Sequence, residues 1–205
     1  MGEWRSPLPI ACIVEGNGEE RAVPELVRRV ARHLEPHVPV DPFLSQRISR
    51  SRLVGSPPHL EHAIEYAARR AGSGSAILVI LDADEDCPRT LAPSLLKRAR
   101  AARADMRIAV VLAKCEYEAW FLASATSLRG QCGLEIDLSA PAHPETIRDA
   151  KGWLTEHMPR GAPYKETLHQ LQLTTQFDLA LARSINSFDK LYRDIQALVG
   201  AASNG

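Results

Sequence analysis

The chain has 205 residues, of which 45% are hydrophobic and 24% charged, and its 25 basic and 25 acidic side chains give a formal net charge of +0. These values exclude a disordered chain and argue against a generally basic protein that coats nucleic acid, although a local basic patch would fit them. The longest apolar runs fall far short of the roughly 20 residues that a membrane span requires, so we expect no membrane association.

The first half of the chain alternates between strand and helix patterns. The apolar, β-branched run at 10–14 predicts a buried strand, and helical spacing of apolar residues predicts a helix from about residue 19 to 34. Residues 40–44 predict a weaker second strand, because Pro39 precedes it and Pro42 interrupts it. A loop follows, and the next helix is expected over 60–71. Residues 76–81 then form the clearest strand pattern of the chain.

The pattern continues with a helix over 91–99, a strand over 107–113 and a helix over 116–125. Trp120 and Phe121 in the last of these are expected to be core anchors. Strands that are apolar on both faces and alternate with amphipathic helices indicate a parallel sheet covered on both sides.

We therefore predict an α/β fold with a mainly parallel sheet of about four strands. Residues 1–125 form this core, and residues 126–205 form a helical extension packed on it as part of a single structural unit. Within the extension, short helices are expected near 144–157, 165–171 and 185–199, and Trp153 is expected to anchor it. The four cysteines are widely spaced without a C-x-x-C pair, which predicts a reduced, cytoplasmic setting.

Acidic residues follow three of the predicted strands. They are Glu15, then Asp82 with Asp84 and Asp86, and then Glu116 with Glu118. The carboxyl ends of parallel strands meet at one edge of a sheet, so these side chains should converge. If residues 82–86 stay extended, their three carboxylates point the same way, because side chains alternate with period two. A divalent cation such as Mg²⁺ would offset the repulsion.

Several simpler interpretations compete with a metal site. The acids at 82–86 could form a solvated loop, but an EF-hand loop is excluded because its sixth and twelfth positions would be Cys87 and Pro93. Glu19 and Glu20 are best explained as acids in the first turn of a helix, where the helix dipole favours them. Glu116 and Glu118 lie two apart on an expected helix and cannot share a face, so we favour Glu116 for the site.

The turn EGNGEER at 15–21 is not a phosphate-binding loop. It lacks G-K-[ST], its third expected glycine is Arg21, and its glutamates would repel phosphate. We expect Gly16 and Gly18 to let the chain turn sharply while presenting Glu15.

Four stretches of the chain carry a resemblance to known families. They are IVEGNGEERAVPELVRR (13–29), ILVILDADEDCP (77–88), VVLAKCEYEAWFLAS (110–124) and DAKGWL (149–154). A strand ending in V-E-G-x-x-E and a second ending in D-x-D are similar to the TOPRIM domain of topoisomerases, bacterial primases and overcoming-lysogenization-defect nucleases. The full set resembles a bacterial family, domain of unknown function 4276. The resemblance implies a Toprim-like, Rossmannoid core of three layers.

The resemblance also implies roles for individual acids. Glu15 matches the TOPRIM glutamate, which acts as general acid/base or metal ligand, and Asp82 and Asp84 match the D-x-D metal ligands. Asp86 extends this set, and Glu116 joins it by its position after a strand. The implied chemistry is metal-assisted phosphoryl transfer, in which one or two Mg²⁺ (or Mn²⁺) ions polarise a phosphodiester and activate a water.

A polyanionic substrate also requires cations at the rim of the site. The candidates are Arg47, Arg50 and Arg52 in QRISRSR, together with Lys114 and Lys151. We therefore expect a nuclease or nucleic-acid-processing component, with a protein partner if it works in a multi-component system such as a defence system. Two alternatives stay open: a non-catalytic Toprim-like binding module, and an enzyme acting on small nucleotides. Oligomeric state is open as well.

Overall fold

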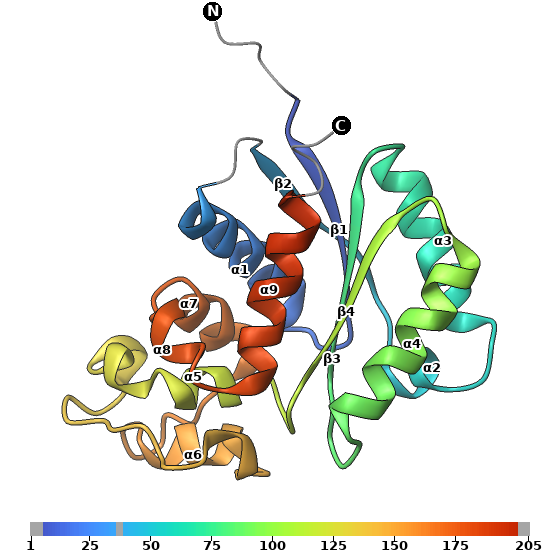
Figure 1. The fold of residues 1–205 in the computed structure, drawn as a ribbon. Helices are drawn as coiled ribbons and strands as arrows, with labels where there is room; N and C mark the ends of the chain where they lie inside the picture. Colours follow the sequence, from blue (N-terminus) through green and yellow to red (C-terminus); the bar gives the residue numbers. More distant parts are fainter. Residues whose placement is uncertain (1–5, 36–38, 201–205) are drawn as a thin grey trace, which may run out of the picture.

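The computed structural model describes residues 6–35 and 39–200. Its centre is one sheet of four parallel strands in the order β2-β1-β3-β4 (Figure 1). The strands are β1 (Leu8–Val14), β2 (Val40–Arg47), β3 (Ala76–Asp82) and β4 (Arg107–Ala113). The predicted α/β fold with about four parallel strands is confirmed.

Helices cover both faces of the sheet (Figure 1). On one face lie α2 (Arg50–Val54), α3 (His59–Ala71) and α4 (Pro88–Ala102), and on the other lie α1 (Glu19–Leu34) and α9 (Asn186–Gly200). Successive strand residues serve opposite faces: Ala11 and Ile13 pack with α3 and α4, whereas Ile10 and Cys12 pack with α1. This double coverage explains why every residue of β3 is buried.

Strand β2 forms despite Pro42 because it is an edge strand. It pairs with β1 alone, and Pro42 lies opposite Ile10 in a parallel register. A proline lacks an N–H donor, and an edge strand tolerates this loss on its unpaired side. The strand is therefore longer than predicted and reaches Arg47.

The helical extension packs on the face of the sheet that α1 and α9 cover (Figure 1). Helix α5 (Ala119–Ala123) comes at the end of the core and is followed by η1 (Ala125–Leu128), η2 (Gln131–Gly133), η3 (Pro144–Thr146), α6 (Ala150–Glu156), the π-helical turn η4 (Glu166–Gln170), α7 (Leu171–Thr174), α8 (Leu179–Ala182) and α9. Trp120 and Phe121 are fully buried and Trp153 packs against the same core cluster, as predicted. Helix α8 was not predicted.

The segment after β4 differs from its prediction. A helix was expected over 116–125, but α5 begins only at Ala119. Residues 114–118 form a turn in which Cys115 has a φ of 60°. This turn decides which glutamate faces the interior.

None of the helices within the described ranges combines the length and apolarity that crossing a bilayer requires.

Candidate functional site

Four carboxylates gather where three neighbouring strands end. Glu15 follows β1, Asp82 ends β3, Glu118 follows β4, and Glu19 lies in the first turn of α1. Backbone groups tie these elements together: the Tyr117 N–H donates to Asp82 Oδ1 at 2.7 Å, and the Glu15 N–H donates to Glu19 Oε2 at 3.1 Å. We call Glu15, Glu19, Asp82 and Glu118 the buried acid cluster. The predicted convergence of acids at this edge is confirmed for Glu15 and Asp82.

The cluster is largely removed from water. Asp82 is 9% exposed, Glu19 is 3% exposed and Glu118 is fully buried, whereas Glu15 is half-buried. Burial disfavours the charged form, so it raises the pKa of Glu118 to about 7. Burial is also the main cause that raises the pKa values of Glu19 and Asp82, and repulsion from the other members of the cluster adds to it.

Two carboxylate oxygens of the cluster have no hydrogen-bond partner although they are buried. They are Oε2 of Glu15 and Oε2 of Glu118. Burial raises the pKa of Glu15 first, and the negative charge of Asp84 raises it further. Unpartnered buried oxygens are costly, so this place in the fold favours a proton or a cation.

Lys151, at the start of α6, is a positive charge that lowers the pKa values of Asp82, Glu118 and Glu15. Its Nζ lies 3.3 Å from Glu166 Oε2. Burial alone would lower the pKa of Lys151, but the carboxylates of Glu118, Asp82, Glu116 and Glu166 raise it above its ordinary value. The lysine therefore stays charged and offsets part of the repulsion within the cluster.

Asp84 and Asp86 are arranged differently from the prediction. The chain turns after Asp82, because Asp84 adopts a left-handed conformation with a φ of 48° and the Asp86 N–H donates to the Ala83 carbonyl at 2.9 Å. The expectation that the three aspartates point the same way is therefore wrong. The alternation of an extended strand ends at Asp82, which is buried, while the other two are exposed.

Arg50 offsets the repulsion between the two exposed aspartates. Its guanidinium forms ion pairs with Asp84, at 3.3 Å, and with Asp86. It also donates to the backbone carbonyls of Asp82, at 3.0 Å, and Ala83, at 3.1 Å. Arg50 thus holds the loop after β3 in place. Arg50 therefore has a structural role within the chain, and its contact with a substrate stays a prediction.

Glu118, and not the favoured Glu116, is the fully buried acid after β4. Glu116 Oε2 accepts hydrogen bonds from the backbone N–H groups of Ala150, at 3.0 Å, and Lys151, at 3.4 Å, at the start of α6. Glu118 is the fully buried member. The argument from helical faces failed because residues 116 and 118 lie in the turn before α5.

Glu19 is the site residue that sequence reasoning missed. Its Oε2 accepts the N–H groups of Glu15 and, at 3.0 Å, Gly16, so it reaches back from the helix to the preceding turn. The helix dipole alone does not explain a 3% exposed glutamate. The signal was its place as the second glutamate of V-E-G-x-x-E. Its carboxylate also occupies donors that a phosphate would need, consistent with rejecting a phosphate loop.

A glycine is required at position 18 because the helical extension packs closely against it, and not because the backbone has an unusual conformation there. Its φ is −66°, which any residue can adopt. A Cβ there would lie 2.2 Å from Gln170 Oε1 and 2.8 Å from the Glu166 carbonyl oxygen. Gly18 was expected to allow a sharp turn, but in the structure it instead allows close contact with the helical extension.

The other predicted cations differ in their surroundings. Arg47 pairs with Glu20 at 2.7 Å, Arg52 is exposed and Lys114 is half-buried beside the loop that follows β4. Arg52 and Lys114 form no ion pair within residues 6–35 and 39–200, and they therefore remain the candidates for contact with a polyanion. Their contact with a substrate stays a prediction.

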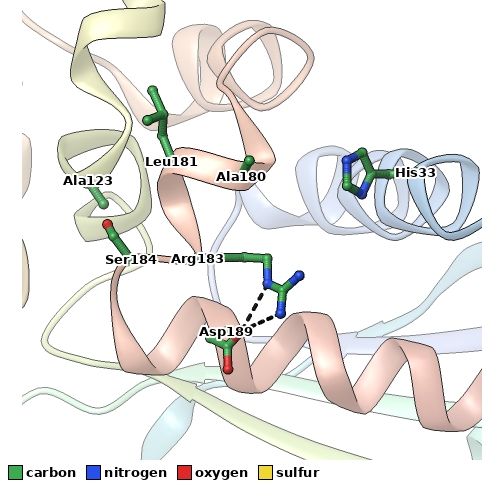
Figure 2. Close-up of a pocket in the computed structure, with 7 residues that line it drawn as sticks. All are labelled: His33, Ala123, Ala180, Leu181, Arg183, Ser184 and Asp189. Atoms are coloured by element: carbon green, nitrogen blue, oxygen red, sulfur yellow. Dashed lines mark hydrogen bonds and ion pairs between the residues drawn. The ribbon is translucent and has the colours of Figure 1, made fainter.

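No three Asp, Glu, His or Cys side chains within residues 6–35 and 39–200 already stand in an arrangement that could hold a metal ion. The acids of the buried cluster also do not line the pocket of about 500 Å³ drawn in Figure 2. That pocket lies among α1, α5, α8 and α9, where Arg183 pairs with Asp189 at 2.9 Å beside His33. The charge of Arg183 in this pocket is therefore offset by Asp189.

Comparison with known proteins gives one match. A family described as domain of unknown function (DUF4276) matches residues 14–196, which include every residue of the buried acid cluster. No curated protein and no solved structure matches the chain.

Proposed function

The chain belongs to the DUF4276 family, whose description states no activity, and from its site we propose a metal-dependent phosphoryl-transfer protein of Toprim-like type that acts on nucleic acid. The observation that carries the proposal is the buried acid cluster, in which four carboxylates share one largely dry region. Such a cluster requires protons or a cation to offset its charge.

The chemistry of these side chains fits Mg²⁺ or Mn²⁺. Both are hard cations that bind carboxylate oxygens, and Oε2 of Glu15 and Oε2 of Glu118 lack any other partner. We assign the cation to Asp82, Glu15, Glu19 and Glu118. Because no three of these side chains already meet at ligand distances within the described ranges, some of them must rotate when a cation binds.

A bound cation would polarise the phosphoryl group of a phosphodiester and would lower the pKa of a water molecule. The chain's own residues then divide the remaining work. Glu15 is the most exposed member of the cluster, so we assign it the proton transfer, through its oxygen other than the buried Oε2. Arg52 and Lys114 would contact the substrate backbone, whereas Asp84 and Asp86 are held by Arg50 and leave the ligand set.

The test is calorimetric titration of Mn²⁺ into the native chain and into Asp82→Asn, followed by a nuclease assay on single- and double-stranded DNA and RNA. We expect binding and cleavage by the native chain and loss of both in the variant. Asp105→Asn is the matched control, because Asp105 is exposed and precedes β4 at the opposite end of the sheet. Cleavage that survives Asp82→Asn would contradict the proposal.

The degree of burial favours a second candidate, a non-catalytic module in which the cation is structural. Glu118 has no exposed surface and Glu19 almost none, so a substrate phosphate would have little direct access to them. In that case Mn²⁺ binds and raises the melting temperature, but no nucleic acid is cleaved. A small-nucleotide substrate, a protein partner and a cytoplasmic setting remain predictions.

A further inference from the structure

Glu118 is held by two donors that come from the helical extension. The Tyr164 hydroxyl donates to Glu118 Oε1 at 2.9 Å, and Gln170 Nε2 donates to the same oxygen at 3.1 Å. Both donors engage one oxygen, and the other, Oε2, is buried without a partner. The carboxylate is therefore fixed in orientation by one oxygen while the second is left available.

The segment that supplies these donors also touches the rest of the site. Gln170 ends the π-helical turn η4, and Glu166 at its start pairs with Lys151 at 3.3 Å. The same turn packs so closely on Gly18 that no side chain would fit there. The turn therefore contacts the loop after β1 as well as Glu118. Single π-helical turns occur frequently at functional sites.

Core packing alone does not account for this arrangement. Tyr164 and Gln170 are themselves buried, and Gln170 Oε1 lacks a partner, as does Glu118 Oε2. A polar network with two unsatisfied atoms is less stable than an apolar cluster of the same shape. A role for the free oxygen explains why a glutamate with two donors lies here.

We propose that Tyr164 and Gln170 are positioning residues, which hold Glu118 by Oε1 so that Oε2 faces the cation. This inference rests on the proposed function, and it makes the helical extension part of the site. Partners of this kind, which orient a metal ligand without touching the metal, typically change metal affinity by about 10- to 100-fold when they are removed.

The test is calorimetric titration of Mn²⁺ into the full chain and into two variants. Tyr164→Phe removes only the hydroxyl, and Gln170→Leu removes the amide at similar volume. We expect each variant to bind Mn²⁺ at least about 10-fold more weakly than the native chain. Two variants keep the test decisive if one of them fails to fold.

The matched control is Tyr192→Phe. Tyr192 is also buried, and its hydroxyl bonds to His33 Nδ1 at 2.7 Å on the α1–α9 side of the molecule. This variant loses one tyrosine hydrogen bond without touching Glu118, so its Mn²⁺ affinity should equal that of the native chain. A purely structural effect of losing a hydroxyl would lower melting temperature in both tyrosine variants but leave affinity unchanged.

The possible failures are distinct. If the native chain binds Mn²⁺ and the variants at 164 and 170 bind it equally well, the positioning role is wrong while the proposed function stands. The same conclusion follows if Tyr192→Phe weakens binding as much as Tyr164→Phe. If the native chain binds no Mn²⁺ up to millimolar concentration, the proposed function and this inference both fail.

Discussion

Replacing Glu118 with glutamine should make the protein more stable at high pH while weakening its metal site. Glu118 is fully buried, and burial raises its pKa from 4.5 to about 7. Because the folded-state pKa lies above the unfolded value, the folded protein binds this proton more tightly. The resulting stabilisation is fully present below pH 4.5 and is lost as the pH rises to about 7.

The size of the effect follows from this shift. One pKa unit corresponds to about 1.4 kcal/mol, so the native chain should lose about 2–3 kcal/mol through Glu118 between pH 5 and pH 8. Glutamine does not ionise, and its carbonyl can accept the hydrogen bonds from Tyr164 and Gln170. The variant should therefore gain about 2–3 kcal/mol on the native chain across this pH range.

The assay is urea unfolding of both proteins at pH 5 and pH 8, with a chelator present so that no metal contributes. Glu156→Gln is the control, because Glu156 is an exposed residue at the end of α6. Its stability relative to the native chain should not depend on pH. A difference for Glu118→Gln that is the same at both pH values, or a net loss of stability that grows toward pH 8, would refute the reasoning.

Three further substitutions test other parts of the site. Arg50→Ala should cost about 2 kcal/mol in urea unfolding, because it removes two ion pairs and the hydrogen bonds to the loop after β3, whereas exposed Arg52→Ala should change stability by less than about 0.5 kcal/mol. Gly18→Ala should cost about 1–3 kcal/mol through its clash with Gln170 and should weaken Mn²⁺ binding. Gly200→Ala is its control in both measurements, since a Cβ there meets nothing within 4 Å. Lys151→Met should strengthen Mn²⁺ binding about tenfold at pH 8, because it removes a competing positive charge; weaker binding would instead mean that the lysine organises the acids.

The fold could be read from the sequence because its signals are local. Strand β3 is a short apolar run with a clear end, and α1 follows its predicted bounds because its apolar residues recur with helical spacing. Strand β2 was predicted to be short, since Pro39 and Pro42 weaken any local pattern. Pairing with β1 along the whole of Val40–Arg47 overcame that weakness, which is a tertiary effect.

Only part of the site could be predicted, because the remainder depends on distant contacts. Glu15 and Asp82 lie directly at strand ends, so topology alone brings them together. Glu118 faces inward because of an irregular turn at Cys115 and because of partners 46 and 52 residues further along the chain. No spacing rule within residues 110–124 contains that information.

The repulsion between neighbouring acids is offset differently at the end of β3 and in the loop that follows it. Asp84 and Asp86 are exposed and share a fixed cation, Arg50, so their charge is offset whether or not a metal binds. Asp82 lies on the buried side of the same loop, where Lys151 is shared among several carboxylates. The buried group therefore retains a negative excess that only protons or an added cation can offset. Because both would occupy the same oxygens, the raised pKa values and the proposed metal site are two consequences of one arrangement.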